Sequence, residues 1–350
     1  ERLKEYGGNT IRTWSAGSAE EVLKDAGQHG IMVAMGLWVQ HESHGFDYND
    51  EEAVKEQLEK FRGIVSNYAG HPSLLMWVVG NEVDLRYSNP KVWDAVDDIA
   101  AMIKEMDPDR PVMTVTAGAK EEVITEIINR APNIDLLGIN SYGGIGSVKE
   151  ELDKAGWSKP YTVTEWGPNG HWEVAKTDWD VPIEQTSTEK QELYKERYQQ
   201  HIWGNKGHCV GSFVFLWGQK QERTPTWYGL FLEDGSETGG VDAMHYNWTG
   251  SWPENRAPQL TSIQIDGMDR FDSPKLNAGK QYSAVLSVED PDGDPLNYNW
   301  VFLKEATDLN YGGGHEDKPD QITGLVEKEN GNQLYFRAPE NEGAYRLFGY

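Results

Sequence analysis

The chain has 350 residues, a formal net charge of −25 and 38% hydrophobic residues. No stretch approaches the ~18 consecutive apolar residues of a helix that crosses a bilayer, so we expect no membrane-spanning segment. The negative charge argues against nucleic acid and anionic membrane surfaces as partners, because their phosphates would be repelled, and it suits a neutral ligand. The single cysteine, Cys209, excludes an intramolecular disulfide and is expected to be an inert buried thiol.

Short apolar segments alternate with amphipathic ones over the first two thirds of the chain. The apolar segments, which predict strands, are residues 10–14, 31–39, 74–82, 111–118, 134–143, 161–168 and 210–218. The amphipathic segments, which predict helices, are residues 18–30, 50–70, 90–108, 120–130, 147–155 and 187–205. This rhythm predicts a parallel α/β fold, either an open doubly wound sheet or a closed (β/α)8 barrel.

Two features favour the (β/α)8 TIM barrel. No glycine-rich phosphate loop follows any predicted strand. Polar and aromatic residues also collect at the C-terminal ends of the strands, where a barrel builds its active site; they include Arg12, Trp14, Trp38, Gln40, Asn81, Glu82, Tyr142, Glu165, Trp166 and Trp217. Seven strands are one short of eight, and the first residues resemble a first helix, so we expect the first strand to precede the sequence.

The composition changes after the last of these strands. Residues 224–259 are rich in aromatic residues, glycine and proline, and they include a linker-like stretch at 253–258. The β-type runs and turn clusters that follow predict an immunoglobulin-like β-sandwich. We therefore expect a barrel at 1–252 and a sandwich, with its last strand missing, at 253–350. The sandwich lacks strand-end carboxylates and is expected to act as a spacer or to present substrate.

Glu82 and Glu165 each end a long apolar strand. A closed barrel brings such strand ends together around one mouth, and two carboxyl groups facing across a cleft are what cleavage of a glycosidic bond requires. Either residue alone would be read as an exposed loop residue or as the partner of a cation. Their shared position at strand ends favours a catalytic pair.

The sequence "GNE" at 80–82, together with "TEWG" at 164–167 three strands later, resembles glycoside hydrolase clan A. The resemblance covers roughly residues 1–252 and is nearest to the barrels grouped with family 2 and to related barrel endo-glucanases. It implies a retaining O-glycosyl hydrolase (EC 3.2.1.-) that works by double displacement. In this scheme Glu82 is the acid/base, Glu165 is the nucleophile and Asn81 holds the sugar 2-hydroxyl.

The resemblance also implies roles for three further residues. Arg12 matches an arginine that positions the nucleophile, and Tyr142 matches a tyrosine that bonds the nucleophile. Trp217 matches the aromatic residue that forms the floor of the subsite for the cleaved sugar. The chemistry agrees, since Arg12 beside Glu165 would keep that carboxylate ionised, whereas Glu82 without a cation would stay protonated. A barrel ion pair for Arg12 and simple packing for Tyr142 and Trp217 remain the alternatives.

Aromatic residues gather in the first part of the chain, where all tryptophans except Trp300 lie. Because aromatic rings stack on the apolar faces of pyranoses, Trp38 is predicted to bind substrate, and residues in the loops after the last two barrel strands are candidate sugar platforms. These loop residues are Trp166, Trp172, Trp179, Trp227 and Tyr228. Core packing is the alternative for each of them.

Two weaker signals concern metals. His41, Glu42 and His44 form a cluster that fits a metal site, a sugar contact or an ordinary loop, and no third group with ligand spacing accompanies it. The acidic turn Asp290–Asp294 resembles calcium-binding turns of β-sandwiches, although turn chemistry alone also explains its aspartates, glycine and prolines. We predict no cofactor otherwise.

The sequence therefore predicts an extracytoplasmic retaining β-glycoside hydrolase, secreted, periplasmic or at the cell surface, that acts on a carbohydrate. The aromatic loops favour a polysaccharide, and a β-glucan with 1,3 linkages is the expected substrate. Two alternatives stay open, a non-catalytic carbohydrate-binding barrel and a metal-dependent barrel hydrolase. No protein partner is indicated.

Overall fold

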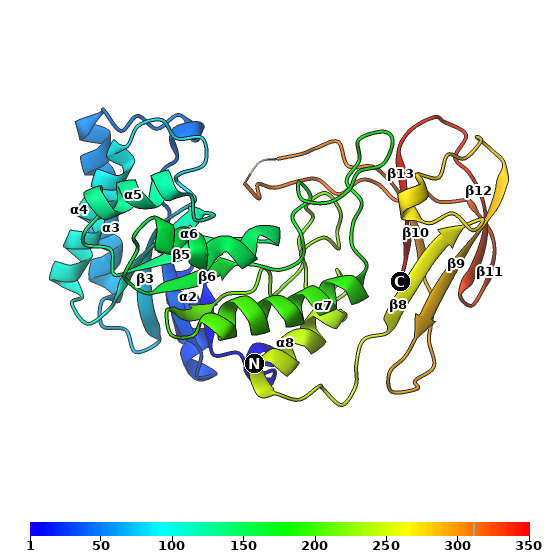
Figure 1. Cartoon of the computed structure of the whole chain (residues 1–350), viewed down its shortest axis with the longest axis horizontal. Coiled ribbons are helices and arrows are strands. Elements are labelled where there is room, and N and C mark those ends of the chain that lie inside the picture. Colours follow the sequence, from blue (N-terminus) through cyan, green and yellow to red (C-terminus); the bar gives the residue numbers. More distant parts are fainter. Residues whose placement is uncertain (311) are drawn as a thin grey trace. The chain divides into compact units, whose positions relative to one another are not determined.

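The computed structural model describes residues 1–310 and 312–350 (Figure 1). The chain divides into two compact units. The first comprises residues 1–166 and 197–215, and the second comprises residues 167–196 and 216–350. Among the described residues, no helix has both the length and the apolar character needed to cross a membrane. The predicted domain boundary at 252/253 stays a prediction.

The first unit is built on a curled parallel sheet of seven strands. The strands are β1 (Thr10–Arg12), β2 (Met32–Leu37), β3 (Leu74–Asn81), β4 (Val112–Ala117), β5 (Leu136–Asn140), β6 (Tyr161–Glu165) and β7 (Cys209–Ser212). Each pairs in parallel with the next one along the chain, which gives the sheet order β1 to β7. The sheet is a partial (β/α)8 barrel, as the sequence predicts, and the first barrel strand, expected to precede the sequence, stays a prediction.

The helices are α1 (Arg2–Glu5), α2 (Ala19–Gln28), α3 (Glu51–Tyr68), α4 (Lys91–Met106), α5 (Glu121–Arg130), α6 (Val148–Lys154), α7 (Ser187–Arg197) and α8 (Gly239–Thr249). Helices α2 to α7 connect the seven strands, whereas α1 precedes β1 and α8 follows β7. Helix α7 continues through a π-helical turn, Tyr198–Ile202, into a short 3-10 turn. Figure 1 shows α3, α4 and α5 together on one side of the sheet. Helix α8 was not expected from the sequence, because it begins with two glycines, which are poor helix formers.

The interior of the sheet explains the unbroken apolar run of β3. Alternate residues of that strand, Met76 and Val78, pack in one core cluster with Met113 and Val115 of β4. The residue between them, Trp77, is fully buried, and its indole nitrogen donates to Asp107 Oδ2 at 2.9 Å. Because side chains of a strand alternate between its faces, this strand is buried on both sides.

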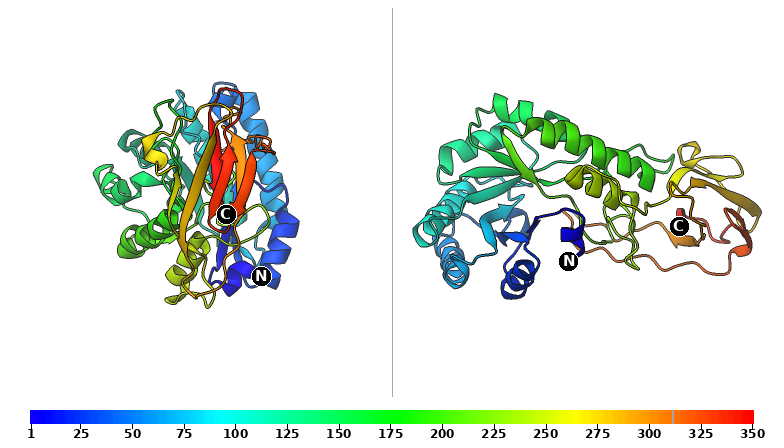
Figure 2. Two further views of the ribbon diagram at one scale, coloured as in Figure 1. Left: turned by 90° about the vertical axis from the view of Figure 1, so that its right-hand side faces the viewer. Right: turned by 90° about the horizontal axis from the view of Figure 1, so that it is seen from below.

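The C-terminal part of the second unit is a β domain. Strands β8 (Gln259–Ile265), β9 (Gln281–Glu289), β11 (Val326–Asn330) and β12 (Gln333–Arg337) form an antiparallel sheet in the order β11-β12-β9-β8, and β10 (Trp300–Lys304) pairs with β13 (Tyr345–Gly349). Figure 2 shows these strands in yellow to red. Leu286, Trp300, Phe302 and Phe336 share one core. The two antiparallel sheets agree with the expected β-rich domain, and its immunoglobulin-like type stays a prediction.

Candidate active site

The chain leaves β3 through a distorted backbone. Pairing of β3 with β4 shifts register between Val78 and Asn81, and Gly80 and Glu82 have φ angles of 79° and 51°. Such left-handed values suit glycine but are uncommon for glutamate, and strain of this kind concentrates at functional sites. The bulge therefore takes Glu82 out of the regular alternation of a strand, while its amide still donates to Val115 O at 2.9 Å.

Three donors converge on Glu165 at the end of β6. Arg12 Nη1 and Trp14 Nε1 each donate to Oε1 at 3.0 Å, and the Tyr142 hydroxyl donates to Oε2 at 3.3 Å. The residue is 8% exposed. Since all three partners donate, both carboxylate oxygens act as acceptors, which is the hydrogen-bonding pattern of an ionised carboxylate.

Arg12 joins the ends of three strands. Besides Glu165, its Nη1 donates to Thr164 O at 3.1 Å and its Nη2 donates to Asn81 Oδ1 at 2.5 Å. Asn140 Nδ2 also donates to Asn81 Oδ1, at 3.2 Å. The oxygen of the Asn81 amide is therefore held by two donors, and this fixes which end of the amide remains for a ligand: the nitrogen, a donor.

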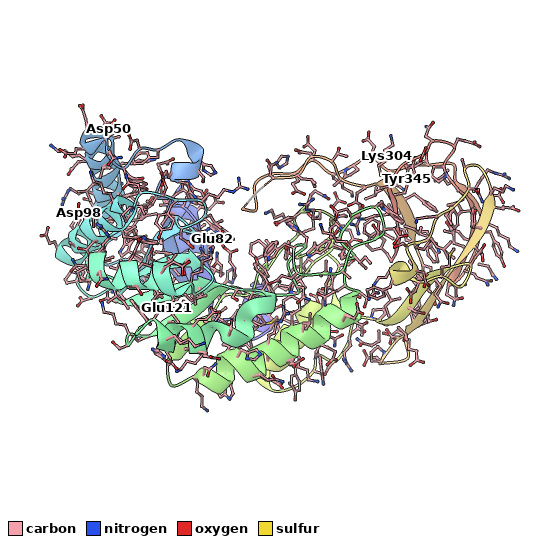
Figure 3. All side chains as sticks on the ribbon, turned by 45° about the horizontal axis from the view of Figure 1, so that its top comes forward. Asp50, Glu82, Asp98, Glu121, Lys304 and Tyr345 are labelled. Carbon is pink, nitrogen blue, oxygen red and sulfur yellow. The ribbon has the colours of Figure 1, made fainter. Side chains whose placement is uncertain are left out.

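Glu82 has a different environment from Glu165. Its carboxyl accepts one hydrogen bond, from Asn140 Nδ2 at 2.9 Å, and it makes no ion pair among the described residues. Burial, followed by the negative charge of Glu165, raises the pKa of Glu82 from an ordinary 4.5 to about 8, although Asn140 and Arg12 oppose the shift. Figure 3 labels Glu82 at the strands of the first unit. The site thus pairs an acceptor carboxylate with a carboxyl that keeps its proton at neutral pH.

Sequence reasoning missed the function of two residues in this network. Asn140 ends β5, and it bridges Asn81 and Glu82 while its own oxygen accepts from Thr164 Oγ1 at 2.8 Å. Trp14 was noticed as a strand-end aromatic but was not assigned to Glu165. A Cβ atom at Gly36 would lie 2.3 Å from Thr13 O and 2.4 Å from the Trp14 carbonyl carbon. Glycine at this position lets the segment that carries Trp14 cross the neighbouring strand.

The structure thus brings Arg12, Asn81, Glu82, Tyr142 and Glu165 into one network. Two other predicted site residues make aromatic contacts. Trp38, which is half-buried, stacks on His41 with ring centroids 5.1 Å apart. Trp217 belongs to the second unit, where it packs against Phe231 and Trp248. The roles of Trp38 and Trp217 in substrate binding stay predictions.

Three of the expected sugar platforms have almost no exposed surface. Trp166 is fully buried beside Tyr198, and Trp227 and Tyr228 are each 1% exposed. Because stacking needs an accessible ring face, this burial favours the packing alternative for Trp227 and Tyr228. It also gives no support to the predicted sugar contact of Trp166, which stays a prediction.

The loop with His41, Glu42 and His44 is held by ordinary hydrogen bonds. Glu42 accepts from the amide and the hydroxyl of Ser88, both at 2.6 Å, and from Asn89 N at 3.0 Å. The bonds from Ser88 lower the pKa of Glu42. The rings of His41 and His44 stack 5.0 Å apart. Both Glu42 oxygens are thus occupied, which favours a structural reading of this loop.

Residues 1–310 and 312–350 contain no group of three or more histidine, cysteine, aspartate or glutamate side chains arranged to hold a metal ion. In the acidic turn at 290–294, Asp290 Oδ1 accepts from the amides of Asp292 and Asp294, each at 2.9 Å. Aspartate side chains commonly bond backbone amides of a turn in this way, so the hydrogen bonds account for Asp290 without a metal. Calcium at the turn stays a prediction.

Comparison with known proteins identifies the family of the chain. The sequence profile described as "Glycosyl hydrolases family 2, TIM barrel domain" matches residues 3–218, which is more than half of the chain. The chain belongs to this family. The predicted resemblance to a clan A barrel grouped with family 2 is thereby confirmed.

Relatives of this family 2 chain include a β-glucuronidase of Canis lupus familiaris, 30% identical over 145 residues, which are 40% of the chain and 20% of that protein. A β-galactosidase of Leuconostoc mesenteroides is 21% identical over 318 residues, or 86% of the chain and 26% of that protein. The chain therefore spans about a fifth to a quarter of the length of these curated relatives.

Solved structures of similar fold include a β-D-glucuronidase of Dictyoglomus thermophilum, with a TM-score of 0.56, 19% identity, and coverage of 72% of this chain and 46% of that one. A family 2 β-galacturonidase of Eisenbergiella tayi has a TM-score of 0.55, 17% identity, and coverage of 71% and 46%. At these identities the structures support the fold.

Proposed function

We propose that this family 2 chain is the catalytic part of a retaining β-glycosidase, with Glu165 as nucleophile and Glu82 as acid/base. The observation that carries the proposal is the contrast between the two carboxyl groups. Glu165 accepts from a guanidinium, an indole and a phenol, whereas Glu82 accepts from one amide and holds its proton. Glycosidases use one carboxylic acid, whose pKa is raised by its surroundings, as the acid and a second carboxylate as the nucleophile.

The two steps of a double displacement match these environments. In the first, Glu82 gives its proton to the leaving glycosidic oxygen while Glu165 attacks the anomeric carbon and forms an ester. The ester carries no charge, so the repulsion that helps to raise the pKa of Glu82 disappears. Glu82, now ionised, then takes a proton from the water that hydrolyses the ester. The coupling between the two groups therefore supports the change of role that Glu82 must make.

Asn81 supplies a donor beside the nucleophile. Because Arg12 and Asn140 hold its amide oxygen, the nitrogen is orientated without any rearrangement of the side chain. A preorganised donor of this kind stabilises charge that develops in the transition state. In the proposed complex it bonds the sugar hydroxyl next to the anomeric carbon, as the clan A resemblance implies.

The proposed substrate is a neutral β-linked glycan, and we keep β-glucan as the specific candidate. The chain carries a net charge of −25, which disfavours an anionic polymer. Arg12, the cation of the described network, already bonds Glu165, Thr164 and Asn81 through its Nη atoms. A β-glucuronide is the second candidate, because relatives of this chain are named β-glucuronidases. A polymeric substrate also supports the proposed extracytoplasmic location.

Hydrolysis of a panel of substrates tests the function. The panel contains aryl β-glucoside, β-galactoside and β-glucuronide, together with soluble β-1,3-glucan, each assayed with and without a chelator. We expect turnover of a neutral glycoside that the chelator does not change. Turnover of the glucuronide alone would favour the second candidate. Binding without turnover would favour a carbohydrate-binding barrel, and loss of activity with chelator would favour a metal-dependent hydrolase.

The raised pKa of Glu82 predicts how activity and stability change with pH. Since the first step needs protonated Glu82, kcat/KM should fall as the pH rises through about 8. The folded-state pKa lies above the ordinary 4.5, so the folded protein binds the proton more tightly than the unfolded chain. The associated free energy of unfolding is therefore fully present below pH 4.5 and is lost as the pH rises towards about 8.

The variant Glu82→Gln is the control for this pH dependence. It keeps the shape of the side chain without an ionisable group, so its melting temperature should fall less than that of the wild type over this pH interval. Thermal unfolding measured at closely spaced pH values gives the comparison. Superimposable profiles of melting temperature against pH would contradict the shift.

A further inference from the structure

Two tryptophans are exposed on the segment that directly follows the proposed nucleophile. Residues 167–186 leave β6 two positions after Glu165 and belong to the second unit. In this segment Trp172 is 59% exposed and Trp179 is 37% exposed. Tryptophan is usually well buried, so two exposed indoles on one segment are informative.

Trp179 is presented by a short hairpin. Lys176 and Pro182 form an antiparallel bridge, Thr177 N donates to Val181 O at 2.9 Å, and Asp180 takes a left-handed φ of 65° at the turn. The ammonium of Lys176 also pairs with Asp180 at 2.8 Å. The indole therefore stands at the tip of a defined turn.

Trp172 is fixed in a different way. Gly170 N donates to Glu173 Oε2 at 2.7 Å and Glu173 N donates to Gly170 O at 2.8 Å, which closes a tight turn around the tryptophan. A Cβ atom at Gly170 would lie 2.5 Å from the indole, so the glycine allows the ring to lie against the backbone. His171 packs edge-on against the same ring at 4.9 Å. The indole therefore lies against the turn and against His171, while much of its surface remains exposed.

The β domain holds the hairpin on both sides of Trp179. On one side Lys275 Nζ pairs with Asp178 Oδ2 at 2.5 Å, and Asp178 N donates to Ser273 Oγ at 3.1 Å. On the other side Arg346 Nη2 donates to Pro182 O at 2.9 Å, and Arg346 Nε pairs with Glu305 at 2.6 Å. Lysine, serine and arginine of the β domain therefore restrain the turn that presents the indole.

A buried ion pair anchors the end of the segment. Glu184 Oε1 accepts from Lys190 Nζ at 2.6 Å and from Thr226 Oγ1 at 2.8 Å, and the side chains of Glu184 and Lys190 are 12% and 10% exposed. Lys190 Nζ also donates to Thr226 O at 2.7 Å. Breaking one partner of a buried pair costs far more than breaking a surface pair, so this end of the segment is firmly placed.

We propose that Trp172 and Trp179 bind pyranose rings of a β-linked polysaccharide as an aromatic platform, and that the β domain holds the hairpin of Trp179 in place. The proposal rests on the proposed glycosidase function and extends it to polymeric substrate. The indoles offer flat apolar faces, which match the C–H faces of a pyranose. Asp178 and the Lys176–Asp180 pair beside Trp179 offer the donors and acceptors that sugar hydroxyls need. Rigid support keeps the entropy cost of binding low.

The test compares three single variants of the full chain, Trp172→Ala, Trp179→Ala and Trp203→Ala. The last is the matched control, because Trp203 is 58% exposed but lies outside the segment, in the first unit. Each is assayed for kcat/KM on the aryl glycoside and on soluble β-1,3-glucan, and for retardation in a gel that contains the same glucan. We expect the first two to lose roughly 2- to 10-fold in kcat/KM on the glucan, mainly through KM. Their activity on the aryl glycoside and all properties of Trp203→Ala should stay unchanged.

The variant Lys275→Met tests the support from the β domain. Lys275 is largely exposed, with 68% of its side chain accessible, so its replacement should leave the fold intact, which circular dichroism checks. We expect a smaller loss on the glucan in the same direction as for Trp179→Ala. Equal losses on both substrates, an equal loss in Trp203→Ala, or unchanged retardation in both platform variants would overturn the proposal.

The gel measurement separates this proposal from the proposed function. If no glycoside is hydrolysed but the glucan retards the wild type and not Trp179→Ala, the platform stands and the hydrolase function fails. If the aryl glycoside is hydrolysed and the glucan neither binds nor reacts, the function stands and the platform fails.

Discussion

Replacing Glu165 with alanine should lower hydrolysis on the order of 10⁴-fold or more, because the route through a glycosyl ester disappears. The donors that serve the carboxylate remain in place. Arg12, Trp14 and Tyr142 would then surround a position that has lost its anion. Added azide should enter this position, attack the anomeric carbon and restore part of the turnover. The product should be a glycosyl azide of inverted configuration, which proton NMR identifies.

A matched control for this variant is Glu42→Gln. Glu42 bonds Ser88 and Asn89 and makes no hydrogen bond to either catalytic candidate, so its activity should stay within a few-fold of wild type. Activity near the wild-type level in Glu165→Ala would remove Glu165 from the nucleophile role. If the active Glu42→Gln variant also formed the glycosyl azide, azide would react without the vacated carboxylate.

The residues at the strand ends of the site could be predicted because local sequence patterns indicate which strands are buried and in which order they follow one another. An unbroken apolar run requires a strand covered on both faces, and parallel strands carry their functional residues at one edge. Glu82 follows such a run and Glu165 ends another buried parallel strand, so their place at one edge follows from the sheet order. The contact of Arg12 with Glu165 also agrees with the clan A resemblance. These inferences need the order of the strands but not their detailed register.

The parts that were missed depend on long-range geometry. Asn140 bridges Asn81 and Glu82 because of the register of β5 and the bulge at Gly80 to Glu82, and neither is visible in composition. Trp14 reaches Glu165 because Gly36 allows a close crossing, which depends on a neighbouring strand. The burial of Trp227 and Tyr228 likewise follows from packing of the loops. Position at a strand end was the one available signal for Asn140 and Trp14.

In the β domain, hydrophobic patterning does not predict strand β11. Strand β11 has the sequence VEKEN and is exposed along its whole length, so it shows no alternation of apolar and polar residues. It is held at the edge of the sheet by backbone pairing with β12 and by the ion pair between Glu327 and Arg337 at 2.7 Å. Charged residues on an edge strand also discourage pairing with other chains. Hydrophobic patterning therefore finds the strands that build the core and misses those that cover an edge.

Glu82→Gln should separate substrates by the quality of their leaving group. The variant keeps the shape of the side chain but loses the proton, so glycosides with poor leaving groups should be affected most. Activated aryl glycosides need little protonation in the first step. They should therefore form the glycosyl ester quickly and then stall, because ester hydrolysis lacks its base. Rapid mixing should show a burst of phenol followed by slow turnover.

Asn81→Ala is the informative comparison for Glu82→Gln. It leaves the proton in place and removes a donor that acts in the transition state, at a cost of roughly 2–4 kcal/mol for good and poor leaving groups alike. If Asn81 and Glu82 merely shaped the bulge after β3, both variants would lower the melting temperature without changing the dependence on the leaving group. A plot of log kcat/KM, which reports the first step, against leaving-group pKa decides between these outcomes. The slope should steepen in Glu82→Gln and stay at its wild-type value in Asn81→Ala, and an unaltered slope in Glu82→Gln would exclude Glu82 as the acid.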